Sequence, residues 1–397
     1  MTIPQQAAYL LQQLNDAGYE AFVVGGCVRD ALLGRPAQDW DICTSALPQQ
    51  TVTVFADRKL VTDGIAHGTV GVVLDGTLYE ITTYRTESGY TDSRHPDAVT
   101  FVRSIGQDLA RRDFTVNAMA YHPEKGLVDL FGGREDLAAG ILRCVGDPEI
   151  RFGEDALRIL RALRFTAVYD FTLHPDTARA VLSCRQGLTH ISAERICAEL
   201  SRFLCGGAAP RLMREFSPTL QTVLPLLPEE ALQKAADRIE NTPPKLSVRL
   251  AALLCSVPTQ AEEILRSLKF SKKQIGQVCD LLNPFPDLPE KAALRLLLGR
   301  LGEDSVRDRL ALERAISGDH DAFFRRTALV DAILLAGDCC TVGQLAVGGE
   351  DLKQLGFSGA AIGQMLQKLL LAVVTDQIAN EKDALLHLAQ NGKEEAE

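Results

Sequence analysis

The stretch FVVGGCVRDALLGRPAQDWDICTS, Phe22–Ser45, has two features that a simple strand, turn and helix do not require. An apolar run ends in Gly25-Gly26, and Asp39 and Asp41 follow with one residue between them. In an extended strand, residues two apart project from the same face, so both carboxylates would be close enough to share a hard cation. Mg²⁺ takes one or two carboxylates and completes its coordination with water and substrate phosphates. We therefore predict that Asp39 and Asp41 are catalytic residues that bind Mg²⁺.

The spacing of these two aspartates is a weak signal when taken alone. Asp319 and Asp321 repeat it in a helical region without supporting residues, and an isolated pair would indicate two solvated loop carboxylates. Here the neighbours favour a site. Gly26 allows a backbone to approach a phosphate closely, and Arg29, at the start of a predicted helix, can donate to a triphosphate oxygen.

Length and composition limit the class of protein. With 397 residues, 46% of them hydrophobic and 24% charged, the chain predicts a soluble globular protein of two or more domains. No apolar run approaches the roughly 20 residues of a membrane span, so no membrane partner is expected. Ten cysteines without a CxxC pair predict free thiols in a reducing cytoplasm. A net charge of −10 is a weak argument against a nucleic-acid partner, because a basic groove can lie on an acidic protein.

The sequence pattern changes from strand-like to helical near residue 138. Between about residues 19 and 102, short β-branched runs alternate with Gly, Asp and Pro signals, which predicts a mixed sheet with helices. After about residue 138 the periodicity is helical. The expected fold class is α+β, with a mixed-sheet N-terminal region followed by an all-α region.

Two further segments before that change carry candidate site residues. Glu80 alternates with apolar neighbours in a predicted strand, so it lies either on the wet face of the sheet or in a site. In Arg111–Tyr121, a helix would bring Asn117 to Asp113, four residues earlier. Arg112 would then bind a nucleotide phosphate while Asp113 and Asn117 hold its sugar. The alternative is a capped helix with surface arginines.

A third segment, GEDALRILRALRF, predicts one apolar helix that carries charges every third residue. Its side chains Asp155, Arg158, Arg161 and Arg164 need anionic or cationic partners if they are buried. Structural salt bridges would provide them. A functional alternative is base selection, because a carboxylate accepts and a guanidinium donates, as cytosine and adenine require. Uracil and guanine would leave buried groups unpaired, at a cost of roughly 1–3 kcal/mol each.

Together these segments resemble a known family. The motifs are VVGGCVRDALLGRPAQDWDICTSALP, HGTVGVVLDGTLYEITTYRTESGYTDSRHPDAVTFVRS, DLARRDFTVNAMAY, DLFGGREDL, RFGEDALRILRALRF and ISAERICAEL, in that order. They look like those of class II CCA-adding tRNA nucleotidyltransferases, and LAVGGEDLKQLGFSGAAIGQMLQKLLLAVV looks like the tail of the short bacterial form. The resemblance covers most of the chain. Two departures are Trp40 between the aspartates, which we expect to pack on the opposite face, and VGGEDL in the tail.

The resemblance implies a polymerase-β-like nucleotidyltransferase head at residues 1–138, a nucleotide-selecting neck at 139–206, a body at 207–330 and a tRNA-binding tail at 331–397. It implies addition of C, C and A to the tRNA 3′ end from CTP and ATP, with Mg²⁺ and without a nucleic-acid template. Glu80 matches the third acidic position. Nucleotide-binding roles are implied for Gly26, Arg29, Arg112, Asp113, Asn117, Asp155, Arg158, Arg161 and Arg164.

Several alternatives remain open from the sequence. A poly(A) polymerase shares the head and most motifs, and a partial enzyme would add only CC or only A. The loop Arg85–Val99 has full length, which favours the complete activity. A silent RNA-binding protein on the same scaffold is disfavoured by the intact aspartate pair. A dinucleotide-binding oxidoreductase is unlikely, because GxGxxG and the later acid are missing.

Overall fold

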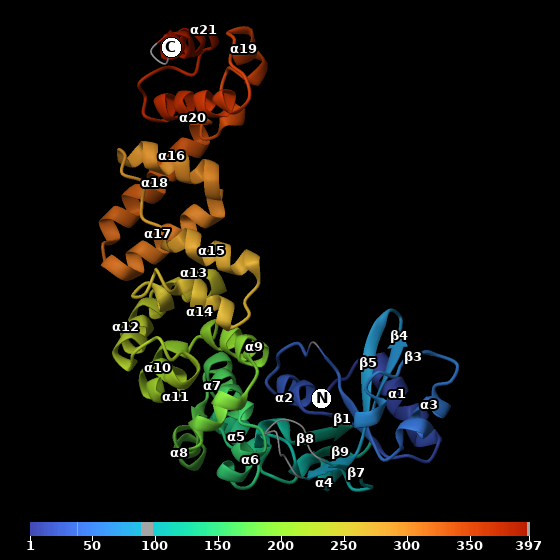
Figure 1. Ribbon diagram of the computed structural model, residues 1–397. Helices are drawn as coiled ribbons and strands as arrows, with labels where there is room; N and C mark the ends of the chain where they lie inside the picture. Colours follow the sequence, from blue (N-terminus) through green and yellow to red (C-terminus); the bar gives the residue numbers. More distant parts are fainter. Residues whose placement is uncertain (38, 89–97, 395–397) are drawn as a thin grey trace. The chain divides into compact units, whose positions relative to one another are not determined.

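The computed structural model describes residues 1–37, 39–88 and 98–394, in two compact units, Met1–Leu232 and Gln233–Glu397 (Figure 1). Most of the predicted loop Arg85–Val99 lies outside the described residues, so its bearing on the complete activity stays a prediction. No described helix is long and apolar enough to cross a membrane.

The first unit begins with a mixed sheet of seven described strands in the order β3-β4-β5-β2-β1-β8-β9. Their bounds are β1 (Ala21–Val24), β2 (Ile42–Thr44), β3 (Lys59–Val61), β4 (Thr69–Leu74), β5 (Thr77–Thr83), β8 (Met119–His122) and β9 (Gly126–Asp129). β2 and β5 are parallel and pair Ile42 with Ile81, whereas the other neighbouring strands are antiparallel. A separate hairpin joins β6 (Arg85–Ser88) to β7 (Ala98–Phe101).

The sheet follows from its sequence. β1 is buried along its whole length, as expected for a central strand, and β5 alternates between buried and exposed residues. Asp75 and Gly76 join β4 to β5, and both have positive φ, at 50° and 79°. An Asp-Gly pair is suited to such a two-residue turn, whose twist matches that of the strands. The hairpin therefore fixes the register of Glu80 against the rest of the sheet.

Helices complete the first unit. Those around the sheet are α1 (Gln5–Asp16), α2 (Gly26–Leu32), α3 (Pro48–Val54), α4 (Ile105–Ala110) and α5 (Gly133–Ala139), with the 3₁₀ turns η1 (Ile65–His67) and η2 (Thr115–Asn117). The later ones are α6 (Pro148–Glu154), α7 (Leu157–Tyr169), α8 (Pro175–Ser183), η3 (Arg185–His190), α9 (Ala193–Leu204), α10 (Ala209–Glu215) and α11 (Ser217–Val223). α7 packs along α9, and most of its side chains are buried.

Two details differ from the sequence expectation. The predicted helix through Gly153–Phe165 is two helices, because α6 ends at Glu154, Asp155 is extended and α7 begins at Leu157. The Asp155 side chain accepts a hydrogen bond from the Leu157 backbone N at 3.0 Å, as a helix cap does. In addition, the short strands β10 (Ile141–Leu142) and β11 (Thr172–Leu173) pair in parallel beyond residue 138. The α+β fold class itself is confirmed.

The second unit is helical in its described part. The boundary between the units falls within α12 (Glu229–Glu240). The following helices are α13 (Leu246–Leu254), α14 (Ala261–Ser267), α15 (Lys272–Leu282), α16 (Glu290–Leu301), α17 (Glu303–Ser317), α18 (His320–Ala336), α19 (Gly349–Gln354), α20 (Ala360–Val374) and α21 (Lys382–Glu394), with η4 (Val342–Gln344) between α18 and α19. One apolar core joins α16, α17 and α18, and another joins α19, α20 and α21.

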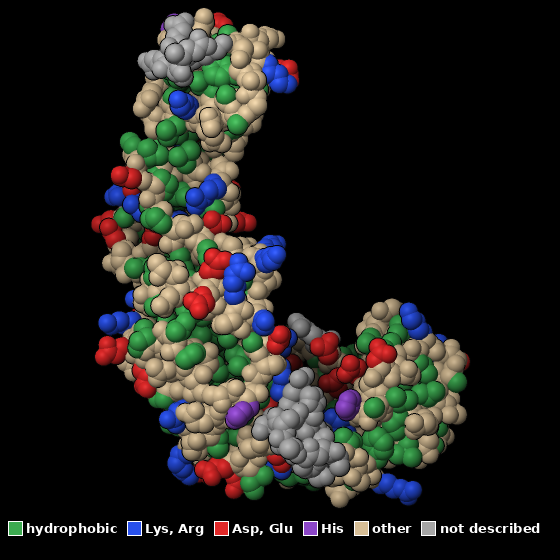
Figure 2. Space-filling view, viewed as in Figure 1, with side chains coloured by type: hydrophobic (Ala, Val, Ile, Leu, Met, Phe, Trp, Pro, Cys, Tyr) green, Lys and Arg blue, Asp and Glu red, His purple; other side chains and the backbone are tan. Residues whose placement is uncertain are grey.

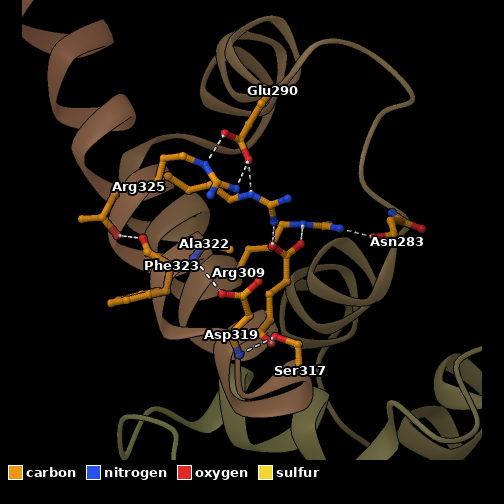
Figure 3. A network of polar contacts seen from close by, with 11 residues as sticks. Asn283, Glu290, Arg309, Ser317, Asp319, Ala322, Phe323 and Arg325 are labelled. Atoms are coloured by element: carbon orange, nitrogen blue, oxygen red, sulfur yellow. Dashed lines mark hydrogen bonds and ion pairs between the residues drawn. The ribbon is translucent and has the colours of Figure 1, made fainter.

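A polar network ties α16, α17 and α18 together (Figure 3). Glu290 accepts hydrogen bonds from Arg325 and Arg326, and Arg326 also donates to Glu313 at 2.7 Å. Arg309 is 3% exposed and donates to Glu313 and to the Asn283 carbonyl. We name these arginines with Glu290 and Glu313 the body network. Its charges are paired inside the unit, which is what burial of a guanidinium requires.

Candidate nucleotide-binding site

The first unit contains a pocket of about 1090 Å³ between the head residues and helices α7 and α9. Every nucleotide-binding candidate from the sequence, together with Asp39 and Asp41, is among its lining residues. Of the candidate site residues, all of which are described, Glu80 alone does not line this pocket. Acidic side chains gather on this unit near α2 and β5 (Figure 2). The structure thus brings three distant segments into one cavity, of a size typical for a small-molecule site.

The acidic side of the pocket is built on the sheet. The Asp41 backbone O accepts a hydrogen bond from Val24 N at 3.0 Å, so pairing of β1 continues one residue before β2. The β2–β5 register brings Glu80 beside Asp41, on the face opposite the buried Tyr79 and Ile81. Trp40 is half-buried and, among the described residues, does not line the pocket. Three carboxylates therefore lie near one another at the start of β2.

Their proximity affects the pKa of Asp41. Surrounding protein atoms raise the pKa of Asp41, although solvent reaches its side chain, and the charge of Glu80 raises that pKa further. Arg112 lowers the pKa of Asp41, and Asp39 adds to the increase. A divalent cation would relieve this repulsion. Among the described residues no group of three His, Cys, Asp or Glu side chains is arranged as a complete metal cage, so other oxygens would have to complete the coordination.

The glycine turn lies beside Arg112. Gly25 has φ of 76°, and a Cβ at this position would lie 2.8 Å from the Arg112 guanidinium. A residue with a side chain would therefore be strained and would displace that arginine. Asp108, a fully buried carboxylate on α4, accepts hydrogen bonds from Arg111 at 2.9 Å and Arg112 at 3.2 Å. Burial alone would raise the pKa of Asp108, but the two arginines hold it below its ordinary value.

Arg29 is held from several sides. It is 5% exposed, and it donates to the Asn117 Oδ1 at 2.5 Å, the Tyr169 hydroxyl at 2.6 Å and the Asp30 Oδ1 at 3.0 Å. Its guanidinium also lies 5.1 Å from the ring centre of Phe165. Arg29 therefore reaches the pocket as part of a fixed polar group, with most of its N–H donors already engaged.

Asp113 and Asn117 meet as the sequence predicts, although through the 3₁₀ turn η2 and not an α-helix. The Asn117 Nδ2 donates to the Asp113 Oδ1 at 3.1 Å, and Arg161 donates to the Asp113 Oδ2 at 2.6 Å. Burial raises the pKa of Asp113, but Arg161 and the Asn117 hydrogen bond outweigh it, so that pKa is lowered. Arg164 forms an ion pair with Glu199 of α9 at 2.8 Å. Its pKa is lowered by burial, which the Glu199 charge opposes.

Asp155 and Arg158 both line the pocket but have different partners. Arg195 of α9 pairs with the Asp155 carboxylate at 2.7 Å and 3.3 Å. Arg158 donates to the Glu154 carboxylate at 2.5 Å and to the backbone O of Arg151 and Arg111. The break between α6 and α7 explains this arrangement, because it turns Asp155 toward α9 and away from the Arg158 side chain.

Sequence reasoning missed several residues of the site. Arg195 lies in the quoted motif ISAERICAEL, so a search for an arginine partner of Asp155 could have found it. Asp108 stands four residues before Arg112, a spacing that predicts an ion pair on a helix. Tyr169 carries no local signal, since its partner Arg29 is 140 residues away. In the second DxD sequence, Asp319 has a structural role, because it caps α18 by accepting a hydrogen bond from Ala322 N.

Three family models match successive parts of this chain. A family model described as the poly A polymerase head domain matches residues 21–143. Others, described as a probable RNA and SrmB-binding site of polymerase A and as a putative tRNA nucleotidyltransferase domain 2, match residues 170–227 and 246–389. The CCA-adding enzyme of Geobacillus thermodenitrificans is 39% identical over 397 residues, covering 96% of this chain and 95% of its own.

This chain belongs to the family of CCA-adding enzymes. The family member from Pediococcus pentosaceus is 36% identical and covers 96% of both chains. A crystal structure of the Bacillus stearothermophilus CCA-adding enzyme in complex with CTP has a TM-score of 0.80 at 34% identity, over 100% of this chain and 99% of that one. As a member of this family the chain is a nucleotidyltransferase, and enzymes of this kind generally use a divalent metal.

Proposed function

We propose that this chain adds C, C and A to the 3′ end of tRNA from CTP and ATP, with Mg²⁺ and without a nucleic-acid template, in the cytoplasm. The observation that carries the proposal is the convergence of three groups on one pocket: the aspartate pair, the glycine turn with its arginines, and Asp155 with Arg158. Each of the ten cysteines is a free thiol, which fits a reducing compartment. The related Bacillus stearothermophilus enzyme was solved with CTP.

Asp39 and Asp41, directly before the start of β2, are suitable ligands for Mg²⁺. Asp39 and Asp41 supply hard carboxylate oxygens. The pKa of Asp41 is raised first by burial and then by the charges of Glu80 and Asp39, and a cation would offset that acidic charge. A site with two protein carboxylates leaves room for water and triphosphate oxygens, as Mg²⁺ prefers. When bound there, Mg²⁺ would supply charge neutralisation at the α-phosphate and a lower pKa for the attacking tRNA hydroxyl. Glu80, which lies beside Asp41 without lining the pocket, would add negative charge near this metal site.

The remaining residues would bind and orient the nucleotide. Gly26 and Arg29 would approach the triphosphate at the start of α2. Arg112, which lies beside the glycine turn and is paired with Asp108, would contact the triphosphate as well. Asp113 and Asn117 would hold the ribose, with Arg161 fixing Asp113. Arg164 would support the same wall through Glu199. Such positioning, with in-line attack and loss of pyrophosphate, accounts for the rate without a covalent intermediate.

Base choice would rest on Asp155 and Arg158. Cytosine and adenine both offer an amino donor next to a ring-nitrogen acceptor, which a carboxylate and a guanidinium can satisfy together. Arg195 holds the Asp155 carboxylate on one side, and a carboxylate has further lone pairs for an incoming amino group. A nucleotide that presents the opposite pattern would leave these groups unpaired in a partly dry pocket.

The domain scheme fits this assignment. Residues 1–138 would form the head, 139–206 the nucleotide-selecting neck, 207–330 the body and 331–397 the tRNA-binding tail. All the lining residues of the pocket except Gly207 come from the first two of these segments. The second unit, which begins at Gln233, would then serve tRNA binding.

The test is incorporation into tRNA that lacks its terminal CCA, with Mg²⁺ and with CTP alone, ATP alone or both. Gel analysis should show addition of two nucleotides with CTP alone and of three with both. A long A tail would instead identify a poly(A) polymerase. Absence of CTP use would identify an A-adding enzyme, and a stop after two nucleotides with both substrates would identify a CC-adding enzyme.

A further inference from the structure

A ring of polar contacts, closed through α7 itself, connects the middle and the last residue of α7 with α2 and with the segment Asp113–Asn117. Arg161 on α7 donates to Asp113, and Asn117 donates to the same carboxylate. Asn117 in turn accepts from Arg29 of α2, and Arg29 donates to the hydroxyl of Tyr169, the last residue of α7. Four hydrogen bonds thus join three segments that the sequence keeps far apart.

Tyr169 contributes both its ring and its hydroxyl to this ring of contacts. The hydroxyl accepts from Arg29 at 2.6 Å and donates to the Asp30 Oδ1 at 2.8 Å. The guanidinium of Arg29 lies 4.5 Å from the ring centre, and that of Arg35 lies at 4.8 Å. Phe171 stacks on the same ring with centres 5.5 Å apart, so the orientation of Tyr169 is fixed.

Arg29 depends on these contacts for its own orientation. An arginine has several rotatable bonds, and each costs free energy to immobilise when a ligand binds. Here Asn117, Asp30 and Tyr169 each accept an N–H from Arg29, so contacts within the protein hold the guanidinium. A guanidinium fixed in this way can meet a phosphate oxygen without further ordering, which favours binding.

We propose that Tyr169 is a positioning residue for nucleotide binding, whose hydroxyl orients Arg29 and, through Arg29, Asn117. This inference rests on the proposed role of the pocket in binding CTP and ATP. Burial raises the pKa of Tyr169, and Asp30 raises it further while Arg29 opposes. The hydroxyl therefore keeps its proton at neutral pH and can donate to Asp30.

The test uses the full chain with Tyr169→Phe, which keeps the ring and removes the hydroxyl. Because a hydrogen bond to a charged group is lost, we expect Kd and KM for both CTP and ATP to rise about tenfold. Turnover at saturating nucleotide and the preference for CTP over UTP should stay near those of the unchanged chain. Tyr121→Phe is the matched control, since the Tyr121 hydroxyl donates to the Met1 backbone O, away from the pocket, and its loss should leave KM unchanged.

A double variant distinguishes a role of Tyr169 in positioning Arg29 from a general role in stabilising the fold. In a chain with Arg29→Lys, the fork that Tyr169 orients is absent, so adding Tyr169→Phe should produce no further loss of CTP affinity. Additive losses would overturn the proposal, and so would an unchanged Kd in Tyr169→Phe. If Tyr169→Phe melts at a lower temperature and folds poorly, Asp30→Ala removes the acceptor of the Tyr169 hydroxyl. Unchanged CTP affinity in that variant would also overturn the proposal.

Equilibrium binding of CTP in Mg²⁺, measured without tRNA, keeps this inference separate from the proposed function. A chain that binds CTP but makes a different tRNA product would refute the CCA assignment and leave the role of Tyr169 standing. A chain that makes the full CCA product but binds CTP equally well with and without the Tyr169 hydroxyl would refute only the role of Tyr169.

Discussion

The pocket of the first unit and the body network of the second unit are built from the same residue types and differ in what surrounds them. In both, arginines on helices pair with carboxylates from other segments of the same unit. Arg158, Arg161 and Arg164 line a pocket of about 1090 Å³. Arg309, by contrast, is 3% exposed and bonds to Glu313 and to two backbone carbonyls.

The comparison shows that arginine spacing on a helix does not identify an anion site. Salt bridges satisfy the guanidinium groups in both places. Structural salt bridges were one interpretation of the α7 arginines from the sequence, and these arginines do have such partners. What distinguishes the first unit is that its pairs form the wall of a cavity that Asp39 and Asp41 also line, where burial and nearby acidic charge raise the pKa of Asp41. Function should therefore be sensitive to the pocket pairs and stability to the body network.

The largest effect is expected for Asp41→Ala. Loss of a carboxylate that we propose to hold the metal should remove several kcal/mol of transition-state stabilisation, so nucleotide incorporation should fall by about 10³-fold or more. tRNA binding, measured by gel shift, should change little. Asp321→Ala is the control, because this exposed residue belongs to the other DxD sequence, on α18. Retained turnover in Asp41→Ala, or equal loss in both variants, would refute the metal assignment.

The next effect concerns stability in the second unit. Arg309→Met removes a buried cation together with its hydrogen bonds to Glu313 and to two backbone carbonyls, which should cost about 3 kcal/mol. Thermal melting should show a lower midpoint, while KM for CTP stays the same. Arg325→Met is the control, since Arg325 is largely exposed and its pair with Glu290 is screened by solvent, so the midpoint should barely move. A body network with functional importance would instead change KM.

A smaller effect is expected on base choice. Asp155→Ala removes the proposed acceptor for the amino group of cytosine and adenine, so discrimination against UTP should weaken by about 2 kcal/mol, or roughly 30-fold. Competition between CTP and UTP in single-nucleotide incorporation measures this ratio. Asp147→Ala removes another carboxylate of the same segment, the cap of α6, and should leave the ratio unchanged. Undiminished rejection of UTP in Asp155→Ala would contradict the proposed side-chain recognition.

Local patterns in the sequence predicted much of this molecule. Strand alternation correctly placed Glu80 on the face opposite its apolar neighbours, and the glycine turn before α2 was expected. The meeting of Asp113 and Asn117 was also expected, because their spacing is short enough for local geometry to decide it. The resemblance to the family supplied the order of the segments, and the comparisons confirm it.

Other parts of the site could not be predicted because they depend on contacts between distant segments. The break at Asp155 follows from a side chain that caps the next helix, which competes with a continuous helical pattern. Arg195 reaches Asp155 only after α9 packs on α7, and Tyr169 meets Arg29 only after α7 packs beside α2. Periodicity describes one element at a time, so it carries no information about such pairings.

The Asp75-Gly76 hairpin has a consequence for how this protein can change in length. Because side chains alternate along β5, removal of one residue from the hairpin would shift the strand by one position and turn Glu80 to the opposite face of the sheet. Ile81 would then take its place beside Asp41. Single-residue insertions and deletions in this turn should therefore be tolerated far less than substitutions at the same positions, although the turn itself lies outside the pocket.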